Sequence, residues 1–249
     1  LNEGSAQVQA QQIGANNISH QGNSAQSASV RGLQGALTSN AAGVMGANIK
    51  ANQAAATGIQ SSQGSLSQAK IRDLALSKNN DQASVQASRI SGSGLDTKDV
   101  DMDSFSVGNL QASGNANDQS FQASLGHLNA QKVQHQAGTL GSVSGKGLQV
   151  SGDVDDKLLS ASAQKVSATG INAGSTQVGS ASLQGAAFEK NDQSMSATLD
   201  SASAKSIAAN GTSVHSANVA GASFQSDGAK NISATLDSAS AKNIATGDA

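Results

Sequence analysis

The sequence contains no cysteine, proline, tryptophan or tyrosine, and it has only four phenylalanines in 249 residues. The lack of cysteine excludes disulfides, thiolate metal sites and a cysteine nucleophile. Aromatic side chains, which stack on nucleic-acid bases, are nearly absent. The usual means of thiol chemistry and of base recognition are therefore missing.

Charge of either sign is also scarce. Lys and Arg number 15 against 17 Asp and Glu, which gives a net charge of -2. No basic excess is present to neutralise a phosphate backbone, so we predict that the chain does not bind nucleic acid. No apolar segment approaches the roughly 20 residues of a membrane-spanning helix, so we predict no membrane insertion.

Large apolar side chains are few for a chain of this length. Leu, Val, Ile, Phe and Met together number 48, and nearly half of the 37% hydrophobic fraction is alanine. An ordinary globule of this size could not close-pack a thick core from so few large side chains. We therefore expect a fold with a thin interior. Chains this poor in large apolar residues are often disordered, but those usually carry a high net charge.

An internal repeat runs through the whole chain. Seven apolar anchors recur at intervals of 36 to 38 residues, and each is followed two positions later by alanine. The anchors are Ile13, Ile49, Val85, Phe121, Leu159, Met195 and Ile232. A second apolar series lies between them and consists of Leu33, Ile71, Val107, Val143, Val178 and Val214. Each unit therefore divides into two halves of about 18 residues, which makes residues 1–249 a single repeat domain.

Turn-forming residues precede several anchors. They occupy the segments Asn80–Gln82, Asn117–Gln119, Asp153–Asp156 and Asn191–Gln193. Asn and Asp bend the chain through side-chain hydrogen bonds to the backbone. A period near 36 also suits helical repeats, but Gly, Asn and Ser interrupt the units and disfavour helix interiors. Between the interruptions apolar and small polar residues alternate, which favours short strands.

These features together predict an all-β fold, a β-solenoid. About 13 to 14 coils of ~18 residues, arranged as seven repeats of 36–37 residues, would stack into a rod of about 65 Å. The large apolar residues would fill a narrow lumen. An uncapped solenoid exposes unpaired strand edges, so we expect end-to-end self-association or continuation into a longer chain.

The 36–37-residue units, rich in Ala, Ser, Gly, Asn and Gln, resemble secreted bacterial β-solenoid repeat proteins. These include rod segments of adhesins and the Fap-type functional amyloid fibres of biofilms. The resemblance implies a non-enzymatic structural protein without a cofactor, secreted or at the cell surface, with a cell-surface or matrix partner. The alternative function is a solenoid module that binds a surface or a glycan.

The acidic residues Asp96, Asp99, Asp101 and Asp103 form the sharpest local cluster. On a strand, Asp99, Asp101 and Asp103 would project from one face and repel one another unless a cation or Lys98 lay among them. They are therefore a weak candidate cation site, with calcium as the ion. The favoured interpretation is a solvated loop excursion at residues 96–104 without a metal.

No catalytic residues can be assigned from the sequence. The four histidines, His20, His127, His135 and His215, show no metal-ligand spacing. Left-handed β-helix acyltransferases resemble the chain in having coils of ~18 residues, and that resemblance would make His127 a catalytic candidate. Lys205 and Lys242 occupy equivalent positions in successive repeats; they are predicted to discourage sideways association, with polyanion binding as the alternative.

Overall fold

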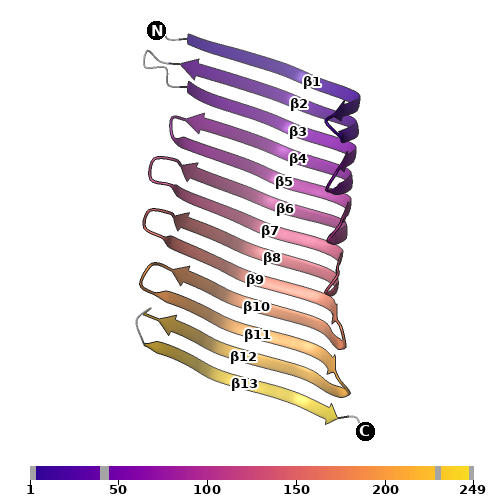
Figure 1. Cartoon of the computed structure of the whole chain (residues 1–249), viewed down its shortest axis with the longest axis vertical. Coiled ribbons are helices and arrows are strands. Elements are labelled where there is room, and N and C mark those ends of the chain that lie inside the picture. The colour runs from indigo at the N-terminus through magenta and orange to yellow at the C-terminus, as the bar shows by residue number, and fades with distance from the viewer. Residues whose placement is uncertain (1–3, 40–44, 228–230, 247–249) are drawn as a thin grey trace.

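The computed structural model describes residues 4–39, 45–227 and 231–246. Within these ranges the protein consists of one sheet of thirteen strands and contains no helix (Figure 1). The strands are β1 (Gly4–His20), β2 (Asn23–Ser39), β3 (Met45–Ser61), β4 (Gly64–Asn79), β5 (Gln82–Thr97), β6 (Val100–Asn115), β7 (Ser120–His135), β8 (Gly138–Asp153), β9 (Leu158–Ala173), β10 (Thr176–Lys190), β11 (Met195–Ala209), β12 (Thr212–Ser226) and β13 (Ile232–Thr246). The predicted all-β class and the tandem repetition are confirmed.

The sheet is an antiparallel meander in which each strand pairs only with the strands before and after it. Figure 1 shows the strands following one another in chain order from the N-terminal to the C-terminal end. Their lengths decrease along the chain, from 17 residues in β1 to 15 residues in β13. Typical strands have about five or six residues, so these are unusually long.

The structure does not confirm a solenoid. The sheet is open, since β1 and β13 each pair on one side only. Each unit of about 18 residues is one long strand with its turn, where we expected one coil of several short strands. Successive units run in opposite directions, whereas the coils of a β-helix stack in parallel.

Two kinds of turn alternate along the chain. Each odd-numbered strand connects to the next strand by a two-residue turn, as at Asn210–Gly211, where both residues have positive φ. Such turns match the twist of hairpin strands. The opposite edge holds Asn80–Asp81 and the longer turns Ala116–Gln119, Val154–Lys157 and Asn191–Ser194. The turns predicted before the anchors are confirmed.

Every strand contains one interior residue with a positive φ. On the even-numbered strands these residues form a first bend row of Gly32, Asp73, Asn109, Gly147, Gly185 and Gly221. On the odd-numbered strands they form a second bend row of Asn17, Gly58, Gly94, Lys132, Gly170, Ser206 and Asn243. Register places each row straight across the sheet. A left-handed residue within a strand turns the chain, and glycine, asparagine and aspartate adopt this conformation most easily. Pairing stays one-to-one on both sides of each bend, so neighbouring strands bend together without a bulge.

The bends keep the apolar side chains on one face. In β6 the apolar residues after Val100 are Met102, then Phe105 and Val107, then Leu110 and Ala112, with steps of three residues at each bend. Strict alternation would send Phe105 and Met102 to opposite faces. At each bend every strand has one more residue between its apolar side chains than strict alternation allows, so both side chains return to the same face.

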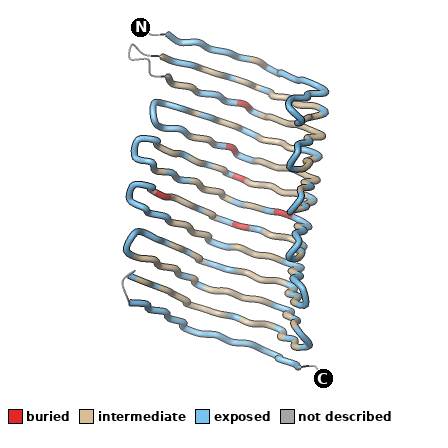
Figure 2. Tube along the Cα trace, viewed as in Figure 1, coloured by how far each residue is buried: buried red, intermediate tan, exposed pale blue. Residues whose placement is uncertain are grey.

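The sheet has no enclosed core. Among the described residues only Ala51, Ala87 and Ala130 are buried apolar side chains, and none of the larger side chains is fully buried. Figure 2 shows isolated buried positions within a half-exposed sheet, with the most exposed residues at the turns and in β1 and β13. The thin interior expected from the sequence is thus one layer of apolar side chains on one face of the sheet, and no second layer covers it within the described residues.

Candidate interaction surfaces

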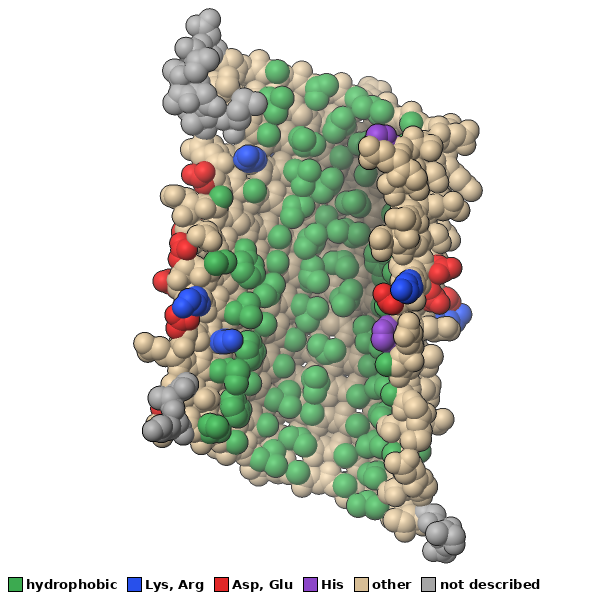
Figure 3. Space-filling model, viewed as in Figure 1, with side chains coloured by type: hydrophobic (Ala, Val, Ile, Leu, Met, Phe, Trp, Pro, Cys, Tyr) green, Lys and Arg blue, Asp and Glu red, His purple; other side chains and the backbone are tan. Residues whose placement is uncertain are grey.

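An apolar face covers one side of the sheet. It consists of five cross-strand rows, which on β6 contain Met102, Phe105, Val107, Leu110 and Ala112. Every member of these rows, on all thirteen strands, is Ala, Val, Ile, Leu, Met, Phe or Gly. Figure 3 shows these side chains as a continuous field, with charged side chains confined to its margins.

Large and small residues are matched across the strands of this face. Phe105 lies between Gly92 of β5 and Ala130 of β7. Its ring occupies the space that a Cβ at Gly92 would need, 2.5 Å away. Phe188 and Phe224 likewise pair with alanines on both neighbouring strands. This matching packs the side chains sideways within the layer but leaves their outer surface uncovered.

The apolar face is hollowed along one side. Figure 3 shows a raised polar ridge at the edge that holds the two-residue turns, with a shaded trough beside it. The strands bend close to this edge in Figure 1, near the second bend row. The face therefore combines a broad field with one raised wall.

The seven repeat anchors do not form a single row. Ile49 and Val85 lie in the row of Ala112, whereas Ile13 lies in the row of Val107. The other four pair along the margin of the apolar face, in the row of Phe121. The three-residue steps at the bends, which recur in every unit, are the sequence signal that identifies the actual rows.

The acidic segment 96–104 forms a tight hairpin, with Lys98–Asp99 as a two-residue turn between β5 and β6. Asp101 pairs across the strands with Asp96. Asp103 of β6 lies opposite Lys132 of the second bend row, and its carboxylate binds Lys132 Nζ at 2.6 Å. This contact raises the pKa of Lys132, through the hydrogen bond and the charge of Asp103. The described residues contain no group of three or more acidic or histidine side chains arranged to hold a metal.

His127 lies on β7, exposed, with its ring over Gly108 of β6. Its cross-strand partner on β8 is Lys146, and its side chain points to the face opposite that of its apolar neighbour in β7, Leu128. The stacked parallel coils that carry the acyltransferase resemblance are absent from the described ranges.

Lys205 and Lys242 lie in one row, separated by Ser216, so the structure places them on the same face.

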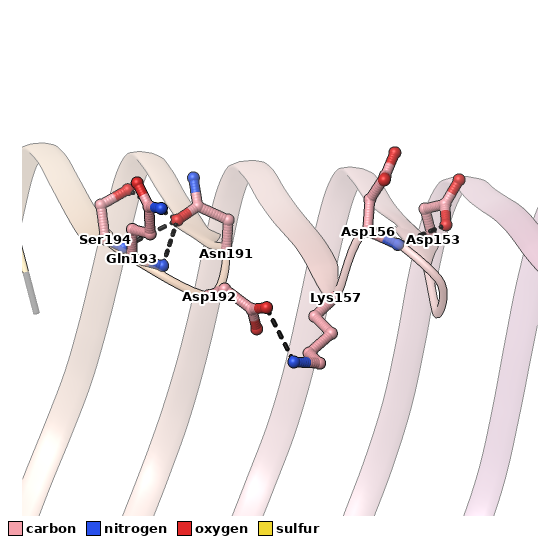
Figure 4. A network of polar contacts seen from close by, with 7 residues as sticks. All are labelled: Asp153, Asp156, Lys157, Asn191, Asp192, Gln193 and Ser194. Carbon is pink, nitrogen blue, oxygen red and sulfur yellow. Dashed lines mark hydrogen bonds and ion pairs between the residues drawn. The ribbon is translucent and has the colours of Figure 1, made fainter.

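Polar contacts link successive long turns at the other edge. Lys157 Nζ reaches the carboxylate of Asp192 in the following turn at 2.7 Å (Figure 4). Gln119 Nε2 donates to Asp155 in the same manner at 2.7 Å. Within one turn, Asn191 Oδ1 accepts from the backbone nitrogens of Gln193 and Ser194. These contacts are exposed, so each contributes little to stability alone.

Asp118 is the described acidic group with the clearest change in acidity. Hydrogen bonds from the hydroxyl and the backbone nitrogen of Ser120 lower its pKa below the ordinary value of 3.8, and Asn115 donates a further bond. An open hollow of about 570 Å³ lies beside this turn and reaches Phe121 and Gly152. The Asp118 bonds are those of a turn and hold the chain locally.

Comparisons with protein-family models, with curated proteins and with solved structures find no match to the chain. No described helix is long and apolar enough to cross a membrane.

Proposed function

We propose that the chain is a non-enzymatic structural protein, a segment of a rod or fibre, that associates with further copies of itself. The observation that carries this proposal is the uncovered apolar face, which spans all thirteen strands. Apolar patches larger than a few hundred Å² are rare on monomers and mark interaction sites.

Surface area gives the size of the missing contact. The chain exposes 15722 Å², whereas a compact monomer of its mass, 24.5 kDa, would expose roughly 10,100 Å². The excess of about 5,600 Å² per chain exceeds the total area of a standard protein interface, about 1,600 Å². A second layer over the apolar face would remove much of it.

A second copy is the occupant that fits this face best. Two apolar faces can pack about 10 Å apart, as two sheets of a sandwich do. The opposite face of the sheet is polar, so stacking of an apolar face on a polar one is unfavourable. A two-fold arrangement brings identical apolar faces together and leaves the polar faces in water. The lumen expected of a solenoid would then form between two chains.

The edge strands supply the direction of growth. β13 is exposed along its whole length, and β1 is exposed at all described positions but one. An unpaired edge is a template for another strand, in a further copy or in a continuation of the same chain. We propose a secreted or cell-surface location, as in an adhesin or a biofilm matrix filament; the resemblance of the repeat composition to secreted repeat proteins supports it.

Electron microscopy of the purified chain over a range of concentrations tests this function. We expect filaments whose length increases with concentration, with a strand spacing of about 4.8 Å along the axis. Particles of one fixed size at every concentration would contradict end-to-end growth.

A further inference from the structure

A row of basic side chains crosses the polar face of the sheet. Its members lie in one continuous line of cross-strand pairs from β2 to β9, separated only by Gln53 and Gly108. This basic row consists of Arg31, Arg72, Arg89, His127, Lys146 and Lys165, and it contains all three arginines of the chain. Seven strand spacings give it a length of about 34 Å.

Like charges face each other directly within the basic row. Arg72 pairs with Arg89, and Lys146 pairs with Lys165. Like charges in directly opposed positions destabilise a sheet. The two ion pairs found among the described residues, Lys132–Asp103 and Lys157–Asp192, do not involve the row. Neither ion pair offsets the repulsion within the row, whereas an anion from outside the chain would.

The surroundings of the basic row strengthen its positive field. All six members are exposed, and each lies next to an apolar-face residue in its strand, so alternation directs it to the opposite face. Lys70 lies two residues from Arg72 on the same strand. One carboxylate, that of Asp73, follows Arg72 directly in the chain, and it accepts a hydrogen bond from Ser88 Oγ at 2.6 Å.

We propose that the basic row binds a linear acidic polysaccharide, laid across the strands on the polar face. An extended chain with regularly spaced carboxylates or sulfates can follow a straight line of cations, and arginine can bind such groups through two parallel hydrogen bonds. Neutral side chains such as Gln53 between the cations can hydrogen-bond sugar hydroxyls.

Nucleic acid fits the same surface less well. All four phenylalanines belong to the apolar face or its margin, so the polar face has no aromatic side chain for base stacking. The phosphates of a duplex wind around its axis, and a flat sheet could contact them only intermittently. A wide sheet also cannot enter the major groove, which admits a helix or a two-stranded ribbon.

The inference does not depend on the proposed function, because the basic row and the apolar face are on opposite sides of the sheet. Self-association could fail while polysaccharide binding holds, and the reverse is also possible. Sedimentation of the same samples distinguishes the two failures.

The test compares two variants of the full chain that lose the same charge. The row variant combines Arg72→Gln, Arg89→Gln, Lys146→Gln and Lys165→Gln. The control variant combines Lys78→Gln, Lys98→Gln, Lys205→Gln and Lys242→Gln. Each lowers the net charge by four from -2. Binding of labelled polygalacturonate, which carries carboxylates, and of heparin, which carries sulfates, is measured by fluorescence anisotropy at about 0.15 M salt.

We expect the wild type to bind at least one of the two polymers, and the row variant to lose about tenfold or more in affinity with a shallower salt dependence. The control variant should change by less than about threefold, since its lysines lie off the row. Equal losses in both variants, or no binding by the wild type, would overturn the proposal. Row-dependent binding of duplex DNA as tight as that of the polysaccharides would also overturn it.

Circular dichroism checks that the row variant remains folded. Its thermal midpoint should not fall, because the substitutions remove repulsion between exposed groups. If the four-residue variant does not fold, the pair Arg72→Gln and Arg89→Gln is compared with Lys205→Gln and Lys242→Gln. The row pair must still weaken binding more than the control pair.

Discussion

At the residue scale, the fold depends on backbone conformations that only certain residues adopt easily. Gly185 has a φ of 59° in the first bend row, and a Cβ there would collide with the carboxylate of Asp200. The left-handed conformation costs a residue with a side chain about 1–2 kcal/mol. Glycine at this position thus relieves both backbone strain and crowding.

We predict that Gly185→Ala lowers the free energy of unfolding by about 1–2 kcal/mol, measured by urea denaturation at fixed protein concentration. Gly14→Ala is the matched control. Gly14 does not have a positive φ, and the nearest atom to its added Cβ is 3.7 Å away. The control should change stability by less than about 0.5 kcal/mol. Equal effects of the two substitutions would contradict the bend-row account.

Asp118 gives a pH-dependent prediction. The pKa of its carboxyl lies below 3.8 in the folded state, so its hydrogen bonds contribute fully above 3.8 and are lost as the pH falls through the folded-state pKa. Asp118→Ala should therefore destabilise the protein at neutral pH, and the difference from wild type should shrink as the pH falls below 3.8. Urea denaturation at several pH values measures this. Ser120→Ala removes one of the hydrogen-bond donors to Asp118 and should reproduce part of the effect. A stability difference between wild type and Asp118→Ala that does not change with pH would refute this prediction.

At the element scale, the sequence predicted the β-structure and the long turns, but neither the length of the strands nor how they pair. The Asn-Asp-Gln segments were correctly identified as turns because their side chains bend the chain locally. We also expected Gly, Asn and Ser to interrupt the units and to separate short strands, and Gly185 and Asn109 are residues of this kind. They are bends within continuous strands, which local chemistry does not distinguish from turns.

A unit of about 18 residues is compatible with two folds. It is the length of one solenoid coil and also of one long strand with a short turn. The two alternatives differ in whether successive units run parallel or antiparallel, which depends on pairing between distant residues. The basic row was missed for the same reason, since Arg72 and Arg89 become neighbours only through the register of β4 and β5.

The matching of phenylalanine with glycine can be tested on the pair β5 and β6. Gly92→Ala should cost about 1 kcal/mol, because the new Cβ would meet the ring of Phe105. Phe105→Leu removes that ring, so the double variant should be more stable than the sum of the single effects predicts, by about 0.5 kcal/mol or more. Urea denaturation of the four proteins gives the coupling energy. Strictly additive effects would show that the two residues do not pack against each other.

At the scale of the whole molecule, a single layer leaves its apolar face in water, which is unfavourable. Flat sheets of many strands are usually stabilised by stacking on another layer. In Figure 1 the axes of the thirteen antiparallel strands are nearly parallel to one another, with little twist between neighbouring strands. Together with the excess surface, this arrangement favours a second layer.

Adjacent residues on opposite faces of β10 provide a direct test of the apolar contact. Leu183 lies on the apolar face and is 42% exposed, and Gln184 points to the polar face. We predict that Leu183→Lys weakens self-association at least tenfold, because a buried ammonium group is strongly disfavoured in the interface. Gln184→Lys carries the same charge and should leave self-association unchanged. Size-exclusion chromatography over a range of concentrations compares the two, and equal behaviour would place the contact elsewhere.

The central claim is that the apolar face is covered by another copy of the chain, and sedimentation equilibrium of the wild type tests it most directly. The account predicts a mass of at least twice 24.5 kDa at micromolar concentration, together with a β-sheet spectrum. A folded species of 24.5 kDa that persists at every concentration would contradict it.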